Sequence, residues 1–352
     1  MPEKMYPLAR MLYKNSRAPT SFRRSLSGGM QEFFIHEVTP RDGLQNEKAV
    51  LTVDQKLNLI EGLVKSNPAS IEVCSFVRED RVPAMAGSAE LVQQLSNAGW
   101  ATDAKARGMH FAALVPNQKG FEAFHNVASP ILDTVVVLTS CTESHSKANV
   151  GMGLATALKT TCDIIKDAKA EGYRVLAFAS LAFGCPFEGN VDPIVVRDIV
   201  NAYSELDVDR IVLADTQGKA KPDQVDVLLS PEVLKPSIGR DRIGMHMHNT
   251  NGLAHANVLQ GVRNGIKHFD SSIGGCGGCN FLPGAQGNIS TQSLLKTIEE
   301  EMLVHTKEGS RLLHGMDHAE IHKVHVQLES ALGNPLPFEY EKGVLEVFDV
   351  IQ

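Results

Sequence analysis

The feature of this sequence that most constrains its fold is an alternation between short β-branched or apolar runs and longer amphipathic stretches, which begins near residue 33. Such alternation is typical of strands and helices that build a parallel β-sheet. Helical periodicity is clearest in residues 54–65 and 193–206. The sequence contains eight strand-like runs, at residues 34–38, 70–75, 110–115, 134–139, 175–181, 210–214, 242–246 and 268–272. Eight strand–helix units in roughly 250 residues match one barrel, so we predict an α/β fold with a TIM (β/α)8 barrel.

A doubly wound open sheet is the alternative to the barrel. It is disfavoured because no predicted strand leads into a Gly-x-Gly-x-x-Gly turn that opens a helix. We predict three parts, namely an N-terminal arm at residues 1–32, the barrel at 33–305, and a C-terminal helical extension at 306–352. Residues 310–332 read as one appended helix.

Composition excludes several classes of protein. The 352 residues carry a formal net charge of -7, which argues against a nucleic-acid partner because that would need a basic patch. No apolar run approaches the roughly 20 residues that span a bilayer, so we expect no membrane partner. Six dispersed cysteines favour a reducing compartment over a disulfide-stapled module. We therefore expect a cytoplasmic protein. The mitochondrial matrix is the alternative if the basic, serine-containing residues 1–30 are a transit peptide rather than a packed arm.

Polar residues follow the predicted strands at the end where TIM barrels place their catalytic groups. His246 and His248 are two residues apart and would point to the same side of strand seven. A His-x-His pair alone is also found as core or loop histidines. Asp42, after strand one, and Asn288, after strand eight, come from neighbouring strands of a closed barrel. The four side chains therefore predict a metal site, and their oxygen and imidazole ligands favour Mg²⁺ or Mn²⁺ over structural zinc.

Two further features accompany this predicted site. Arg41 precedes Asp42 and could neutralise an oxyanion beside the metal, or could form a surface ion pair. A glycine-rich segment surrounds Cys276 and Cys279, which fits a mobile lid that delivers a proton. A redox Cys-x-x-Cys pair and a passive turn are the other interpretations of this segment.

Several segments, in order, closely resemble the hydroxymethylglutaryl-CoA lyase family over about residues 33–305. They are His-Glu-Val-Thr-Pro-Arg-Asp-Gly-Leu-Gln-Asn-Glu at 36–47, Ile-Glu-Val-Cys-Ser-Phe at 71–76, Val-Pro-Asn at 115–117, Lys-Gly-Phe-Glu at 119–122, Gly-Cys-Pro-Phe-Glu-Gly at 184–189, and Gly-Gly-Cys at 277–279 through Gly-Ala-Gln-Gly-Asn at 284–288. The resemblance implies a metal-dependent carbon–carbon lyase that acts on an acyl-CoA thioester.

The resemblance also implies a role for each site residue. Metal binding falls to Asp42, His246, His248 and Asn288. Arg41 would stabilise an enolate oxygen, and Cys279 would be the mobile acid/base thiol. Glu72 and Asp215 would be supporting acidic groups near the site. For the proposed cleavage we expect His246 or a metal-linked water to act as the base, and Arg41, Gln45 and Ser75 to bind substrate. A homodimer is expected, and no organic cofactor is needed.

Three departures from the family pattern bear on substrate choice. Asn249 replaces the aspartate of the usual His-x-His-Asp-Thr-x-Gly, so a carboxylate near the site has become an amide. Cys276 stands where leucine is usual, and residues 280–282 read Asn-Phe-Leu where Pro-Tyr-Ala is usual. The metal ligands are retained. The resemblance therefore predicts hydroxymethylglutaryl-CoA as substrate, with citramalyl-CoA or a longer 3-hydroxyglutaryl-CoA thioester as alternatives.

Two other functions remain possible from the sequence. Isopropylmalate and citramalate synthases share the Arg-Asp and His-x-His pattern, but Leu44 stands where they usually carry Glu or Thr, and the chain leaves no room for their regulatory extension. A non-catalytic binding or assembly protein would have no physical need for the full residue set.

A histidine stripe lies outside these motifs, with His314, His318, His322 and His325 on one face of the predicted C-terminal helix. We expect it to be solvated or to face a partner rather than to bind metal.

Overall fold

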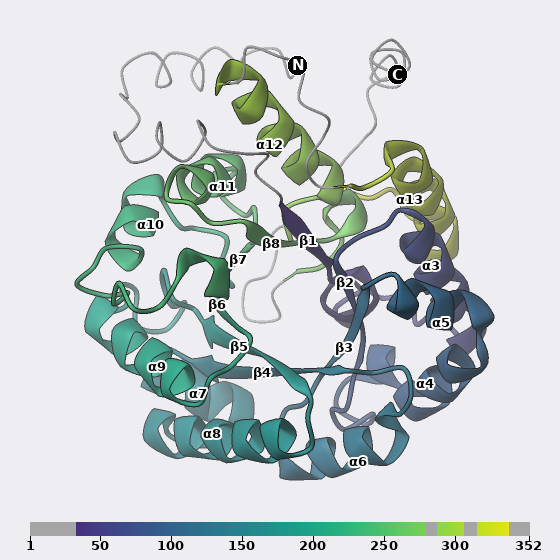
Figure 1. Cartoon of the computed structure of the whole chain (residues 1–352), viewed down its shortest axis with the longest axis horizontal. Helices are drawn as coiled ribbons and strands as arrows, with labels where there is room; N and C mark the ends of the chain where they lie inside the picture. The colour runs from purple at the N-terminus through teal and green to yellow at the C-terminus, as the bar shows by residue number, and fades with distance from the viewer. Residues whose placement is uncertain (1–32, 279–286, 306–314, 338–352) are drawn as a thin grey trace.

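The computed structural model describes residues 33–278, 287–305 and 315–337. Within them, eight parallel strands close into a barrel in sequence order, with helices around it (Figure 1). The strands are β1 (Phe34–Glu37), β2 (Ser70–Ser75), β3 (His110–Leu114), β4 (Thr134–Ser140), β5 (Arg174–Ser180), β6 (Arg210–Asp215), β7 (Ile243–Met247) and β8 (His268–Ser271). Every predicted strand is confirmed to within one residue at each end. The barrel closes through β1 and β8, with Phe34 opposite His268 and Glu37 opposite Ser271.

The helices cover the outside of the barrel. They are α3 (Val53–Lys65), α4 (Ser88–Asn97), α5 (Gly99–Ala106), α6 (Gln118–Ala128), α7 (Glu143–Val150), α8 (Leu154–Ala170), α9 (Pro193–Glu205), α10 (Pro222–Leu228), α11 (Ala254–Arg263), α12 (Thr291–His305) and α13 (His318–Leu332). Local sequence explains several of their starts. Thr52 and Gln55 form a capping box at α3, and Asp192 caps α9 ahead of Pro193. No helix among the described residues is long and apolar enough to cross a membrane.

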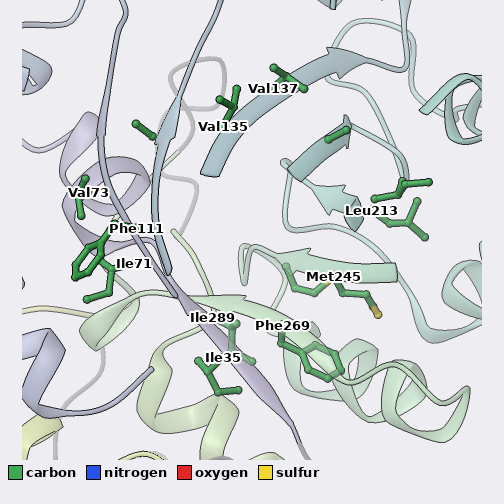
Figure 2. Packing of buried hydrophobic residues seen from close by; sticks show 14 of the residues in the cluster. Ile35, Ile71, Val73, Phe111, Val135, Val137, Leu213, Met245, Phe269 and Ile289 are labelled. Atoms are coloured by element: carbon green, nitrogen blue, oxygen red, sulfur yellow. The ribbon is translucent and has the colours of Figure 1, made fainter. Parts of the chain in front are cut away.

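Alternate residues of β3 to β6 face two separate apolar layers. Val135 and Val137 belong to the large cluster between barrel and helices, seen in Figure 2 with Ile35, Ile71, Phe111, Met245 and Phe269. Val136 belongs instead to a small cluster with Leu114, Phe178, Val212 and Ala214, which fills the barrel interior beside β3 to β6. The interior beside β1, β2, β7 and β8 carries polar side chains. This division places the chemistry on one side of the barrel.

The C-terminal helix begins later than the sequence predicts. The first turn of α13 is at His318, capped by the Asp317 side chain, and Gly315 before it has a left-handed φ of 68°. The start expected at residue 310 is therefore wrong. A left-handed glycine at 315 and a capping side chain at 317 place the first turn of the helix after them. Residues 306–314 lie outside the described residues, as do the predicted arm at 1–32 and the end of the chain from 338.

The histidine stripe is expected to be solvated or to face a partner, and solvation is wrong for His325. His325 is 3% exposed and lies 3.1 Å from Gln292 Nε2, and His318 Nε2 lies 2.8 Å from Glu299 Oε1. His318 and His325 therefore face α12, because this side of α13 packs against the rest of the protein. His314 lies outside the described residues.

Candidate active site

The predicted metal ligands come together at the carboxyl ends of β1, β7 and β8. Asp42 lies in a short π-helix, η1 (Thr39–Gly43), that follows β1 directly. His246 ends β7 and His248 follows it. Asn288 reaches them because its segment pairs with the end of β7, where Ile289 N donates to Met247 O at 2.9 Å and His248 bridges to Asn288.

The four side chains form one buried cluster. His246 Nε2 and His248 Nε2 lie 3.0 Å apart, and Asp42 Oδ2 lies 3.8 and 3.5 Å from them. Asn288 Nδ2 donates to Asp42 Oδ2 at 2.9 Å. One ligand atom each from Asp42 and the two histidines falls within 4.8 Å of the others. Sequence reasoning from strand ends therefore predicted the convergence correctly.

This donor set fits a divalent cation. In the described part of the chain, His248 Nδ1 and Asn288 Oδ1 are buried without a hydrogen-bond partner, which is costly for polar atoms unless something else binds there. Arg41 and the two histidines outweigh the effect of burial and hold the pKa of Asp42 well below its usual range, so this carboxylate stays ionised. A carboxylate, two imidazoles and an amide suit a small hard or borderline cation.

Asp270 is a candidate functional residue that sequence reasoning missed. It lies on β8 beside β7, in register with His246, and its Oδ2 accepts from His246 Nδ1 at 3.0 Å. The Nδ1 proton is thereby fixed, and Nε2 is left facing Asp42. A carboxylate that orients a metal-binding histidine in this way is a common second partner. The available signal was Asp270 itself, an acidic residue in a buried strand.

Arg41 is held in place by Glu72 from inside the barrel. Its Nε donates to Glu72 Oε1 at 2.7 Å and its Nη2 to Glu72 Oε2 at 3.0 Å, and Nη1 pairs with Asp42 Oδ1. The interpretation of Arg41 as a surface ion pair is wrong, because the side chain is buried. Burial opposes its charge, but Glu72 and Asp42 raise the pKa of Arg41 above its usual range. Burial also raises the pKa of Glu72, against the opposing effect of Arg41.

The other predicted residues lie around this centre. Gln45 follows η1, and its Oε1 is buried without a partner among the described residues. The Ser75 hydroxyl lies 3.4 Å from Leu114 O within the barrel wall. Asp215 accepts from the backbone N–H groups of Lys219 at 3.2 Å and Ala220 at 2.8 Å, so its carboxylate orders the turn after β6.

The Asn249 amide, where the resemblance leads one to expect a carboxylate, caps a helix. Its Oδ1 accepts from Ala254 N at 3.1 Å, at the start of α11. In the described structure the side chain is therefore committed to the backbone rather than to the two histidines beside it.

Of the two loop cysteines, the structure describes Cys276. Its thiol is buried and lies 3.3 Å from Gly43 O and 3.4 Å from Glu47 Oε1. Burial, with Glu47, raises the pKa of Cys276 well above its usual range. Cys276 O also accepts from Asn288 Nδ2 at 3.2 Å, so this residue supports a predicted ligand. Cys279 lies outside the described residues.

The two ends of the Cys279 segment approach each other so closely that glycine is required. A Cβ on Gly287 would lie 2.6 Å from the carbonyl carbon of Gly277, inside the closest separation that carbon atoms tolerate. Gly277 and Gly287 therefore lie against each other, next to Asn288.

Glu37 is a second buried carboxylate that the sequence did not single out. On β1 it accepts from Thr39 N at 3.0 Å and Thr291 Oγ1 at 2.7 Å, and also from the Thr39 hydroxyl. Burial raises the pKa of Glu37 to about 7, although these hydrogen bonds oppose the shift. This group ties β1 and η1 to the start of α12.

Comparison with known proteins agrees with this geometry. The sequence profile of the HMGL-like family matches residues 32–326. Hydroxymethylglutaryl-CoA lyase of Pseudomonas mevalonii is 34% identical over 304 residues, 86% of this chain and 94% of that protein. (R)-citramalyl-CoA lyase of Chloroflexus aurantiacus is also 34% identical, over 88% of this chain and 93% of that protein.

Solved structures share the same architecture. The HMG-CoA lyase of Bacillus subtilis superposes with a TM-score of 0.78 at 29% identity, covering 91% of this chain and 99% of that one. An HMG-CoA lyase of Acinetobacter baumannii, solved with coenzyme A and 3-methylmalate, gives a TM-score of 0.75 at 27% identity. The match covers 88% of this chain and 93% of that one. The closed barrel, the converging ligands and the match over most of the chain together show that this protein belongs to the HMGL-like family of hydroxymethylglutaryl-CoA lyases and related carbon–carbon lyases.

Proposed function

We propose that this protein cleaves 3-hydroxy-3-methylglutaryl-CoA to acetyl-CoA and acetoacetate by metal-assisted retro-aldol chemistry. The observation that carries the proposal is the position of Arg41. Its guanidinium sits between Glu72 and Asp42 and beside the cluster of Asp42, His246, His248 and Asn288. A cation site with a fixed guanidinium next to it suits a reaction that creates negative charge on oxygen.

The chain's own residues divide the work. Glu72 holds two edges of the Arg41 guanidinium, which leaves Arg41 preorganised to stabilise the enolate oxygen of the departing acetyl-CoA. When bound, the divalent cation polarises the substrate hydroxyl and fixes its orientation. Asp42, His246, His248 and Asn288 would hold that cation, as Mg²⁺ or Mn²⁺.

His246 offers one nitrogen to the site, because Nδ1 is committed to Asp270. The same Nε2 cannot serve both as a ligand and as the base that removes the hydroxyl proton. We therefore propose that His246 is a metal ligand and that a water molecule in the site removes the hydroxyl proton. Cys279 would then protonate the enolate carbon, with Asp215 as a supporting acidic group and Gln45 and Ser75 in substrate binding.

The names of the relatives favour lyase chemistry for this protein and suggest two candidate substrates. The names of the matched proteins include hydroxymethylglutaryl-CoA lyases, a citramalyl-CoA lyase and an enzyme that also acts on 3-hydroxy-3-isohexenylglutaryl-CoA. The structure solved with coenzyme A and 3-methylmalate supports an acyl-CoA substrate. Citramalyl-CoA is therefore the second candidate, ahead of longer thioesters and of the condensing direction.

The purified protein should be incubated with Mg²⁺ and each thioester separately, with acyl-CoA products followed by mass spectrometry. The proposal predicts acetyl-CoA from hydroxymethylglutaryl-CoA at the highest kcat/KM. Faster cleavage of citramalyl-CoA would reassign the substrate. Absence of cleavage with every thioester, together with condensation of acetyl-CoA onto a keto acid, would overturn the lyase proposal.

The proposed acid/base role of Cys279 has a neighbouring control. Under reducing conditions Cys279→Ser should lose most activity, while Cys276→Ser should stay near wild type. Mild oxidant should inactivate the parent protein reversibly and spare Cys276→Ser if the two thiols form a disulfide. If the two reduced variants were equally active, Cys279 would not be the acid/base. If oxidant inactivated the parent protein and Cys276→Ser equally, the two thiols would not form a disulfide.

The proposal includes a homodimer in the cytoplasm, with the mitochondrial matrix as the alternative. Matched relatives carry both cytoplasmic and mitochondrial names. Light scattering of the purified protein and localisation of a fusion with and without residues 1–30 would decide both points.

A further inference from the structure

A second polar cluster lies inside the barrel at the end opposite the metal ligands. Arg210 and His268 begin β6 and β8, Ser70 begins β2, and His36 lies on β1. All four are buried, between 5% and 8% exposed. None belongs to the site described above, whose ligands lie at the carboxyl ends of the strands.

The Arg210 stem fits inside the barrel beside Gly244, the β7 residue opposite Val212. A Cβ on Gly244 would lie 2.9 Å from Arg210 Cδ, so any larger residue there would collide with the arginine stem. The guanidinium then reaches across to β1, where Nη1 donates to His36 Nε2 at 2.6 Å. His36 and His268 stack, with Nε2 and Nδ1 3.2 Å apart.

The histidines bring no negative charge to Arg210. Arginine only donates, so His36 Nε2 accepts from it, and the His36 Nδ1 proton points to Ser70 Oγ at 2.6 Å. His36 is therefore neutral. Burial, together with Arg210, lowers the pKa of both His36 and His268, which is the behaviour of histidines next to an uncompensated cation.

No carboxylate pairs with this guanidinium. Across residues 33–278, 287–305 and 315–337, none lies within 4.0 Å of Arg210, and Arg210 Nε is buried without a hydrogen-bond partner. The nearby carboxylates are engaged elsewhere. Asp270 accepts from His246 at 3.0 Å, and Asp209 accepts from Val175 N at 2.8 Å and Lys169 Nζ at 3.2 Å.

The other ionisable groups around this end of the barrel include basic side chains and one further carboxylate. Arg174, His110 and Lys267 act on the cluster electrostatically, while Asp133 is held by His110 at 3.1 Å and by Thr134 at 2.7 Å. Buried arginines are almost always paired, since removing a charge from water costs several kcal/mol. Burial lowers the pKa of Arg210 to about 10, although the charges of Asp270 and Asp209 oppose this shift.

We propose that the buried guanidinium of Arg210, beside His36 and His268, binds a small inorganic anion at the amino-terminal end of the barrel. The anion accepts from Arg210 Nε, the unsatisfied donor, and neutralises the guanidinium. Chloride and inorganic phosphate share this chemistry. The site is separate from the substrate site and does not depend on the proposed function.

Chloride binding can be read directly from the 35Cl NMR linewidth of the purified full chain. Wild type should broaden the signal saturably, and phosphate should reverse the broadening if it is the tighter ligand. Arg210→Met should weaken chloride binding at least about tenfold, since a hydrogen bond to a charged group contributes about 1.5–3 kcal/mol. Arg197→Met is the matched control, because Arg197 lies on the surface of α9 and pairs with Asp198 at 3.0 Å. It should bind like wild type.

A second measurement on wild type protects the test against a variant that does not fold. Crystals soaked in bromide should show an anomalous peak within hydrogen-bond distance of Arg210 Nε. Saturable broadening that survives in Arg210→Met, or a bromide-soaked crystal without a peak at Arg210, would overturn the proposal. Broadening that phosphate cannot reverse would restrict the site to halides.

Discussion

At the scale of single residues, each group in the proposed active site is useful because of a neighbour that restrains it. Asp270 leaves His246 with one free nitrogen, Glu72 fixes the plane of Arg41, and Cys276 O holds the Asn288 amide. None of these supporting contacts joins residues close in sequence. Mutation of a site residue and mutation of the neighbour that restrains it should therefore have different effects.

Loss of a metal ligand should reduce cation binding and turnover together. His248→Ala removes one of four converging ligands, so we expect Mn²⁺ affinity to fall by more than the roughly 10- to 100-fold that is typical when a residue that only orients a ligand is lost. Titration calorimetry and activity after chelation and Mg²⁺ addition would measure both. His125→Ala, a half-exposed histidine on α6, serves as control. Full activity of His248→Ala after metal titration would contradict the site.

Loss of Arg41 should act on kcat. An oxyanion donor typically contributes about 10²- to 10³-fold, and Arg41→Met should show this loss with little change in KM. Glu72→Gln should lower kcat less, because it loosens Arg41 without removing the charge. Steady-state kinetics would separate the two, and a rise in KM alone for Arg41→Met would reassign it to substrate binding.

At the scale of elements, one buried carboxylate joins three segments of the chain. Glu37 connects β1, η1 and α12 through Thr39 and Thr291, and Thr39 Oγ1 also accepts from Ile273 N at 2.7 Å, after β8. Asp42 in η1 and Cys276 after β8 both lie close to this junction along the chain. The junction should therefore set the stability of the site's framework.

The stability of this junction should depend on pH. Burial raises the pKa of Glu37 from 4.5 to about 7 in the folded protein, so folding favours its protonated form. Its contribution is fully present below about pH 4.5 and is lost as pH rises to about 7. Wild type should lose more stability than Glu37→Gln between pH 5 and 8, by roughly 1 kcal/mol or more.

Urea unfolding at the two pH values would measure this difference. Glu61→Gln, a partly exposed position on α3 that pairs with Lys65, should follow wild type. Parallel pH profiles for wild type and Glu37→Gln would show that Glu37 is ionised throughout the range.

At the scale of the whole molecule, the chain beyond the barrel packs back onto the helices at its beginning. α13 lies beside α3 (Figure 1), and Asp317 N donates to Ser66 O at 3.0 Å. The two helices meet at Gly62, where an added Cβ would lie 2.8 Å from Val324 Cγ2. A β-branched side chain on a helix has little freedom to move aside.

Gly62→Ala should therefore destabilise the protein, although alanine favours a helix by about 1 kcal/mol over glycine. Overpacking typically costs about 1–3 kcal/mol, so we expect a net loss of stability. Val324→Ala should make Gly62→Ala neutral or stabilising, because it removes the colliding methyl groups. A double-mutant cycle by thermal unfolding would measure this coupling, and additive effects would contradict the contact.

The sequence by itself determined the barrel and most of the residues that meet in the proposed metal site. Strand and helix periods are local properties, and the motif around Asp42 and the His246–His248 pair are contiguous. Placement at strand ends then follows from closure, since the carboxyl ends of parallel strands share one face. The start of α13 was predicted too early, because the cap at Asp317 and the left-handed Gly315 set the first turn at His318.

Only the tertiary structure decided which buried polar groups meet. Glu72 with Arg41, Asp270 with His246, and Arg210 with His36 are pairs 31, 24 and 174 residues apart in sequence. Their contacts depend on which residues the pleat turns inward and on the register between strands, and a shift of one residue would turn each side chain to the other face. The same applies to His325, which is buried because α13 presents that face to the barrel. Patterns along the chain fix what each element is, whereas the closed packing fixes what its side chains touch.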